Sequence, residues 1–336
     1  MRILVLGGTA WLGGAVARAA LDAGHDVTCL ARGVSVPEGA ELVRADRDHL
    51  DAYDAVADRA WDGVVDVARQ PRHVRGAVRA LADSTRHWVF VSTGNVYADH
   101  ATIGADESAA LLDPLAGDMD TMEEYGAAKV SCEAAVLKAC GDRAVIARAG
   151  LIGGPGDESG RSTYWPWRFA HPSSAAGAVL VPDSAVASGL IDVRDLARWL
   201  VEAACGEREP GVYDAIANRC TLAEHLAIAR AVAGHTGTVV AAPDAWLAEH
   251  GVEEWAGPRS LPLWLHDPEW LGFGGRSGAK IAASGLSPRP LAETLADALA
   301  WQASRGDQGP HGAGLTDEEE RALLADLSAP GGVPSP

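Results

Sequence analysis

A tyrosine and a lysine four residues apart are the side chains of this sequence best suited to proton transfer. They open and close the segment YGAAK at 125–129, and on a helix this spacing puts both side chains on one face, a turn apart. A hydride that moves to a carbonyl carbon leaves an alkoxide, which needs a proton donor. A nearby ammonium lowers the pKa of a phenol from about 10. We therefore expect Tyr125 to act as a general acid/base that Lys129 tunes.

Hydroxyl groups end the apolar segment that precedes this helix in the chain. Ser92 and Thr93 follow the run VFV at 89–91. If that run is a strand of a parallel sheet, its carboxyl end lies where such sheets bind ligands. A hydroxyl at that point can polarise a substrate oxygen beside Tyr125.

A glycine-rich turn, GGTAWLGG at 7–14, follows the first apolar run directly. Glycines allow a sharp turn and let a pyrophosphate approach the helix N-terminus, where free amides and the helix dipole attract negative charge. The place of the turn after an N-terminal strand predicts dinucleotide binding. The residues expected to contact the cofactor here are Gly7, Thr9, Ala10, Trp11, Leu12 and Gly13.

The end of the second apolar run bears on which dinucleotide is bound. NAD-dependent enzymes usually place Asp or Glu there to hold the ribose hydroxyls, whereas here Arg32 follows Ala31. An arginine can pair with a 2′-phosphate, so the sequence favours NADP(H) over NAD(H). The alternative is that Arg32 is an ordinary surface residue. Asp46 could accept a hydrogen bond from the adenine amino group, or it could be an exposed turn residue.

Apolar runs and helical patterns alternate through the first half of the chain. Strands are expected at 2–6, 26–30, 41–44, 61–67, 87–92 and 144–148, and helices at 12–23, 72–82 and 125–140. This alternation predicts an α/β fold of the Rossmann type, a doubly wound parallel sheet with helices on both faces. Its carboxyl edge would bring the glycine turn, the hydroxyls and Tyr125 together.

A smaller, mixed C-terminal substrate domain completes the predicted architecture. The NADP-binding Rossmann domain takes 1–155 and about 185–205, the substrate-binding part takes 156–184 and 206–302, and the tail at 303–336 is expected to be partly disordered. Thr221 and Glu224 have the spacing of a capping box, and 316–327 has the pattern of an acidic helix. The irregular stretch 99–124 is long for a plain connection, which favours a functional role.

Charge and cysteine content exclude several classes of function. With 28 basic and 46 acidic residues the chain carries a net charge of -18, which disfavours nucleic-acid binding because phosphate backbones are repelled. Five cysteines without CxxC spacing, and histidines without metal-ligand spacing, predict neither a disulfide framework nor a metal site. The immediate N-terminal strand and the lack of an apolar run of about 18 residues predict a cytoplasmic protein that does not bind membranes.

Taken together, the glycine turn, the YxxxK pair and the segment VSTGNVY at 91–97 resemble the NAD-dependent epimerase/dehydratase superfamily. The resemblance is to its extended and atypical short-chain dehydrogenases/reductases and covers roughly residues 1 to 302. It implies that Thr93 is the catalytic hydroxyl, with Ser92 in reserve, beside Tyr125 and Lys129. It also places Lys129, Ala68 and Gly150 next to the cofactor. A homodimer is one oligomeric state it leaves open.

The segment RSTYWPWR at 161–168 corresponds to the substrate cleft of extended members of this superfamily. By this resemblance Tyr164, Trp165 and Arg168 would contact a flat or partly apolar substrate with an anionic group, although packing in the core of the small domain is an equal alternative. The C-terminal tryptophans 246, 255, 264 and 270 are expected in the core or a lid. Ala149 stands where the superfamily more often has proline.

Three functions are compatible with these residues. The favoured one is an NADP(H)-dependent reductase or dehydrogenase acting on a small carbonyl or alcohol substrate, with a role in specialised metabolism left open. An NAD-dependent nucleotide-sugar epimerase or dehydratase is the first alternative, and Arg32 argues against it. The second is a non-catalytic dinucleotide-binding sensor. The glycine turn resembles the GGTxxLG variant of atypical members of the superfamily, some of which have lost catalysis. Such a loss would show as a broken YxxxK, which is intact here.

Overall fold

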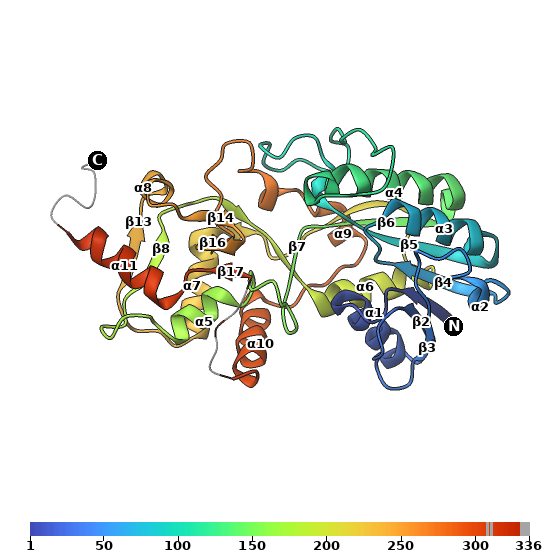
Figure 1. The fold of residues 1–336 in the computed structure, drawn as a ribbon, viewed down its shortest axis with the longest axis horizontal. Coiled ribbons are helices and arrows are strands. Elements are labelled where there is room, and N and C mark those ends of the chain that lie inside the picture. Colours follow the sequence, from blue (N-terminus) through green and yellow to red (C-terminus); the bar gives the residue numbers. More distant parts are fainter. Residues whose placement is uncertain (307–308, 310–311, 330–336) are drawn as a thin grey trace.

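The computed structural model describes residues 1–306, 309 and 312–329. Its larger domain is built on a seven-stranded sheet in the order β11-β6-β5-β4-β1-β2-β3 (Figure 1). All six pairings in this sheet are parallel, which confirms the predicted Rossmann-type α/β fold. The strands are β1 (Arg2–Leu6), β2 (Asp26–Ala31), β3 (Glu41–Arg44), β4 (Trp61–Asp66), β5 (Thr85–Thr93), β6 (Ala144–Ala149) and β11 (Gly211–Ala215).

Helices cover both faces of this sheet because its strands are apolar on both sides. Along β1, Ile3 and Val5 pack toward one face and Leu4 and Leu6 toward the other, and all four are fully buried, as expected for a central parallel strand. The first face is covered by α1 (Trp11–Asp22) and α6 (Val193–Ala204). The second is covered by α3 (Pro71–Leu81) and α4 (Tyr125–Cys140), and the short α2 (Asp54–Ala57) flanks it.

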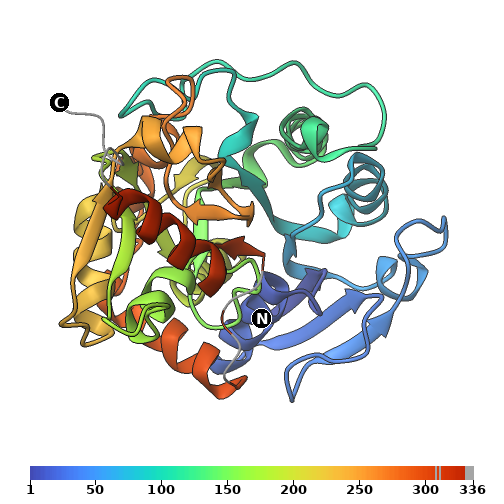
Figure 2. The same ribbon diagram turned by 60° about the vertical axis from the view of Figure 1, so that its left-hand side comes forward.

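The smaller domain lies beside the carboxyl edge of the sheet and has its own apolar core (Figures 1 and 2). Its helices are α5 (Tyr164–Ala170), α7 (Leu222–Val232), α8 (Asp244–Glu249), α10 (Leu291–Ser304) and α11 (Asp317–Ser328). Short strand pairs complete it and the connection to the larger domain: β7 (Leu151–Gly153) with β10 (Leu190–Asp192), β8 (Val179–Pro182) with β13 (Val239–Ala242), β9 (Ala187–Ser188) with β12 (Cys220–Thr221), β14 (Glu253–Trp255) with β16 (Ser260–Pro262), and β15 (Gly257–Pro258) with β17 (Ala313–Gly314).

The domain limits differ from the sequence-based ones in two places. Strand β11 and helix α9 (Ala279–Ala283) were assigned to the substrate-binding part, but β11 pairs with β6 in the large sheet and α9 packs on β11. The acidic helix predicted at 316–327 within the tail is present as α11, and it belongs to the smaller domain because it buries Leu323 and Leu324 in that core. The predicted capping box of Thr221 and Glu224 is present at the start of α7. The end of the tail, 330–336, lies outside the described residues.

The long stretch 99–124 fastens the segment 270–277 to the larger domain. Backbone bonds join Gly272 N to His100 O, Gly104 N to Gly275 O and Ser277 N to Ala105 O. The His100 ring also stacks on Trp270, with 4.4 Å between the ring centroids. This stretch therefore helps to position a wall of the cavity described below.

Three further observations concern membrane-spanning helices, metal sites and disulfides. Over 1–306, 309 and 312–329, no helix is long and apolar enough to cross a membrane. In the same residues no three His, Cys, Asp or Glu side chains gather as a metal site would require. All five cysteines are free.

Candidate active site

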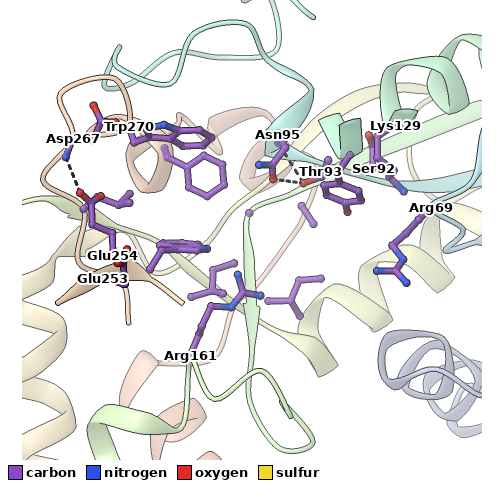
Figure 3. A pocket seen from close by; sticks show the side chains of 18 of the residues that line it. Arg69, Ser92, Thr93, Asn95, Lys129, Arg161, Glu253, Glu254, Asp267 and Trp270 are labelled. Atoms are coloured by element: carbon purple, nitrogen blue, oxygen red, sulfur yellow. Dashed lines mark hydrogen bonds between the residues drawn. The ribbon is translucent and has the colours of Figure 1, made fainter. Parts of the chain in front are cut away.

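A cavity of about 1020 Å³ opens where the carboxyl edge of the sheet meets the smaller domain. Residues that follow β1, β4, β5 and β6 line it on one side, together with the start of α4. The other side is lined by residues 248, 251–255, 265–267, 270 and 273. Figure 3 shows Ser92, Thr93 and Lys129 at one end and Glu253, Glu254 and Asp267 at the other. Ligands of doubly wound sheets bind at this edge, so the cavity is the candidate active site.

The glycine turn has the shape that a pyrophosphate site needs. Gly7 has a φ of +102°, and a Cβ on Gly13 would lie 2.2 Å from the Gly7 carbonyl oxygen, so neither position accepts a side chain. Helix α1 begins at Trp11 and receives no side-chain cap from Ala10, which leaves its first amides for a ligand. The Thr9 side chain lies against Gly33. The turn therefore fits the diphosphate of a dinucleotide.

The predicted cofactor residues divide between the cavity and its surroundings. Ala10, Trp11, Leu12, Lys129 and Gly150 line the cavity. The Trp11 indole donates a hydrogen bond to the Pro155 carbonyl, 2.9 Å away, and so ties the glycine turn to the loop after β7. The Ala68 carbonyl accepts a hydrogen bond from the Lys129 ammonium over 2.8 Å.

Arg32 and Asp46 stand outside the cavity, at the edge where β2 and β3 end. The Arg32 side chain is 71% exposed, and its ion-pair partner is Asp46, with 4.0 Å between Nη1 and Oδ2. The Asp46 carboxylate also accepts a hydrogen bond from the Asp48 amide. Arg32 is therefore only weakly held in the structure, while Asp46 already has two partners.

The phenol and the two hydroxyls come together in the cavity as predicted for a carbonyl-binding site. Tyr125, Ser92 and Thr93 all line it. The Thr93 hydroxyl donates to Asn95 Oδ1 over 2.9 Å and accepts from the Asn95 amide, and Thr93 also interacts with Tyr125. The Ser92 side chain is buried and its hydroxyl has no hydrogen-bond partner among the described residues. Ser92 is thus available to a ligand oxygen, whereas the Thr93 hydroxyl is already engaged with Asn95.

The pKa of Tyr125 differs from the sequence-based expectation. Burial raises it above the ordinary value, and the Thr93 hydrogen bond and the charges of Arg69 and Arg161 only partly oppose this. The expectation that Lys129 would pull this pKa down was therefore wrong in direction. Spacing along a helix places two side chains on one face, but it does not show how much water the phenol loses.

Lys129 is engaged with the backbone beneath the phenol. Its ammonium donates to the carbonyl oxygens of Ala68 and Val91 and lies 4.2 Å from the centroid of the Phe90 ring. Burial lowers the pKa of Lys129 to about 8. The ammonium therefore links the ends of β4 and β5 to α4.

Two arginines that the sequence analysis did not commit to face the same space. Arg69 follows β4, its guanidinium makes no hydrogen bond or ion pair within the described residues, and it lines the cavity. Arg161 lies over the Trp255 ring, 5.5 Å from its centroid, and burial lowers the pKa of Arg161. The signal for Arg69 was present in the sequence, as a cation directly after a strand at the carboxyl edge.

The three predicted substrate residues are core residues instead. Tyr164 and Trp165 are 2% and 0% exposed, and neither lines the cavity. The Trp165 indole donates to the Pro262 carbonyl. Arg168 pairs with Asp317 and Glu320 of α11. The expectation that these residues contact substrate was wrong, because Tyr164 and Trp165 pack in the core of the smaller domain and α11 neutralises the arginine.

Residues from the C-terminal half form the opposite wall of the cavity, and the sequence analysis did not assign them to the substrate site. Trp255, Trp270 and Phe273 contribute aromatic rings to it, together with the carboxylates named above. Trp246 and Trp264 are in the core of the smaller domain, as expected. The backbone of Trp255 has a φ of +64°, a strained conformation for a bulky residue that occurs at ligand-binding sites. Short irregular strands here offered no periodic pattern to read.

Comparison with known proteins agrees with this geometry. A model of the NAD dependent epimerase/dehydratase family matches residues 3–214. The chain is also 31% identical over 260 residues to a 2′-dehydrokanamycin reductase of Streptomyces kanamyceticus, an alignment that covers 74% of this chain and 71% of the relative. The chain belongs to the NAD-dependent epimerase/dehydratase family. The predicted resemblance is confirmed, and the protein is an enzyme of this family.

Solved structures of epimerases share the fold at low identity. A putative epimerase from Burkholderia cenocepacia has 22% identity and a TM-score of 0.67, with 90% of this chain and 98% of that chain covered. A UDP-glucuronic acid 4-epimerase from Bacillus cereus, solved with NAD, has 15% identity and a TM-score of 0.64, with 92% and 99% covered. At these identities the likeness concerns the fold.

Proposed function

We propose that this enzyme is an NADP(H)-dependent reductase that interconverts a small carbonyl compound and its alcohol, with Tyr125 as acid/base. The observation that carries the proposal is the meeting of the Tyr125 phenol with the Ser92 and Thr93 hydroxyls in a cavity that begins at the uncapped end of α1. Hydroxyl donors bind a carbonyl oxygen, and a helix N-terminus suits a diphosphate. The relative named 2′-dehydrokanamycin reductase supports a reduction.

The chain's own groups account for the fate of the carbonyl oxygen. When bound, the nicotinamide supplies the hydride that forms the new C–H bond as the C=O π bond opens. Tyr125 gives its phenolic proton to the oxygen, and solvent later reprotonates the phenolate. Arg69 and Arg161 stabilise the charge on that phenolate, since both lower the pKa of Tyr125. Ser92 can donate a hydrogen bond to the same oxygen.

Two features at the end of β2 support NADP(H) as the cofactor. No carboxylate follows β2 to hold a ribose diol, and Arg32 follows it instead. The Arg32 side chain is 71% exposed, and 4.0 Å separates its guanidinium from the Asp46 carboxylate with which it pairs. The guanidinium is therefore free to turn toward a 2′-phosphate. Such a pair gains from charge-assisted hydrogen bonds.

Turnover assays test the proposed reaction directly. Purified protein is mixed with NADPH or NADH and a panel of small ketones and aldehydes, and the absorbance of the reduced nicotinamide is followed. We expect net consumption of NADPH with at least one carbonyl compound. Retained NAD with no net consumption, together with isomerisation of a nucleotide sugar, would instead identify an epimerase. Dinucleotide binding with neither reaction would identify a sensor.

The raised pKa of Tyr125 predicts opposite pH dependences for the two directions. Reduction needs the phenol, which stays protonated below its pKa, so its kcat/KM should be flat across neutral pH. Oxidation of the alcohol needs the phenolate, so its kcat/KM should rise about tenfold for each pH unit until the pH passes the pKa of Tyr125, which burial raises above its ordinary value. Profiles of both directions check this. A plateau of oxidation near neutral pH would show that Lys129 tunes the phenol after all.

A further inference from the structure

We infer that the substrate carries a positively charged amine at the end of the cavity opposite Tyr125, where Glu253 and Asp267 receive it. This inference rests on the proposed function and names the class of its substrate, an amino-substituted carbonyl compound. It follows from how charge is distributed along one cavity, with a proton donor at one end and carboxylates at the other (Figure 3).

The carboxylates at the far end are not neutralised by the chain. Glu253, Glu254 and Asp267 line the cavity, and none of them pairs with an arginine or lysine in the part of the chain that the structure describes. Glu254 contacts the His266 ring and accepts a hydrogen bond from the Asp267 amide over 3.2 Å. Glu253 and Asp267 are therefore the groups most open to a ligand cation.

The other end of the same cavity independently indicates a ligand. The Ser92 side chain is 3% exposed, and its hydroxyl lacks a partner, although buried hydroxyls normally have one. It lies in the cavity wall with Tyr125. A substrate whose carbonyl oxygen reaches Ser92 and whose body extends along the cavity would present its remote groups to Glu253 and Asp267.

Aromatic rings lie beside the carboxylates and suit the same class of ligand. Trp255 and Trp270 line the cavity, and faces of indole rings attract cations and pack against the C–H groups of small polyols. The Arg161 guanidinium lies over the Trp255 ring, so this ring already makes a cation–π contact in the structure. Trp270 is held from outside the cavity by the His100 ring.

The same charges disfavour an anionic substrate. A phosphorylated or nucleotide-linked sugar would bring negative charge toward the three carboxylates of this wall, and like charges repel each other, although solvent around the exposed Glu253 weakens that repulsion. The net charge of -18 also attracts cations and repels anions at long range. The arrangement thus discriminates between an amine and a nucleotide sugar.

Ligand binding tests the inference with sugar probes that carry a positive, a neutral or a negative group. Glucosamine, its neutral N-acetyl derivative and glucose 6-phosphate are titrated into the NADP⁺-saturated protein, and Kd values are measured by calorimetry or ligand-observed NMR. We expect glucosamine to bind at least about tenfold tighter than N-acetylglucosamine, with a preference that shrinks as salt is raised. Equal affinities, tighter binding of the phosphate, or no binding of any probe would overturn the inference.

Two conservative variants locate the preference on the far wall. Glu253→Gln and Asp267→Asn should each reduce glucosamine affinity about three- to tenfold and leave N-acetylglucosamine unchanged. Asp267→Asn keeps the side-chain oxygen that accepts a hydrogen bond from the Glu269 amide, so that variant should fold. Glu249→Gln is the matched control, since Glu249 is exposed on α8 and does not line the cavity.

Turnover separates failure of this inference from failure of the proposed function. If the enzyme oxidises NADPH with neutral ketones and shows no amine preference in binding, the inference fails and the reductase function stands. If amine binding depends on Glu253 and Asp267 but no carbonyl compound of the panel consumes NADPH, the reductase function fails while the cation site stands.

Discussion

Replacement of Tyr125 by phenylalanine should lower kcat for carbonyl reduction by about 10²- to 10⁴-fold, the range typical of a lost general acid. The variant keeps the ring and therefore the shape of the cavity wall, but it has no proton to give to the alkoxide. NADPH affinity should stay close to that of the unaltered protein, because the glycine turn and α1 are untouched. Steady-state kinetics and a fluorescence titration with NADPH check the two halves of this expectation.

A second tyrosine provides a matched control for that experiment. Tyr213 lies outside the cavity, and its hydroxyl donates to the Glu209 carbonyl over 2.7 Å. Tyr213→Phe should cost about 1 kcal/mol of unfolding free energy at most and leave kcat unchanged. Unchanged turnover in Tyr125→Phe would remove the phenol from the mechanism, and the Ser92 and Thr93 hydroxyls would then be the groups to test.

Replacement of Arg32 by alanine should weaken NADPH binding by about 10- to 100-fold and NADH binding hardly at all. The estimate follows from the loss of charge-assisted hydrogen bonds worth about 1.5–3 kcal/mol, at about 1.4 kcal/mol for each factor of ten in affinity. NADH lacks the 2′-phosphate, so its affinity does not report on this contact. Parallel titrations with NADPH and NADH give the ratio of the two Kd values directly.

An arginine elsewhere on the surface controls for the change in overall charge. Arg79 is exposed on α3 and its side chain makes no hydrogen bond or ion pair within the described residues, so Arg79→Ala should change neither Kd. Equal losses for NADPH and NADH in Arg32→Ala would contradict the proposed selectivity. They would indicate that Arg32 supports the fold of the turn after β2 and does not recognise a phosphate.

Much of the larger domain could be predicted because its determinants are local or shared by all parallel sheets. The limits of β1, β3 and α4 agree with those expected from the apolar and helical patterns. The carboxyl ends of parallel strands meet at one edge, so residues far apart in the sequence, such as Ser92 and Gly150, could be expected to line one site. The capping box at Thr221 depends on only four residues.

The other wall of the site was decided by tertiary packing. A segment with an arginine among aromatic residues looks the same in the sequence whether it lines a cleft or packs in a core. The position of α11, almost 150 residues further along the chain, decides that Arg168 is neutralised by Asp317 and Glu320. In the same way, Glu253 and Trp270 reach the cavity through short strands and loops that carry no periodic pattern.

The sequence by itself determined the Rossmann-type fold, the glycine turn and the grouping of Tyr125, Thr93 and Lys129. These follow from residue periodicity, backbone sterics and the geometry of a parallel sheet, which depend little on distant contacts. The tertiary structure alone decided the protonation behaviour of Tyr125 and the residues that face the substrate. Both depend on which groups exclude water from a given atom, and that is set by segments that are distant in the sequence and adjacent only in the folded chain.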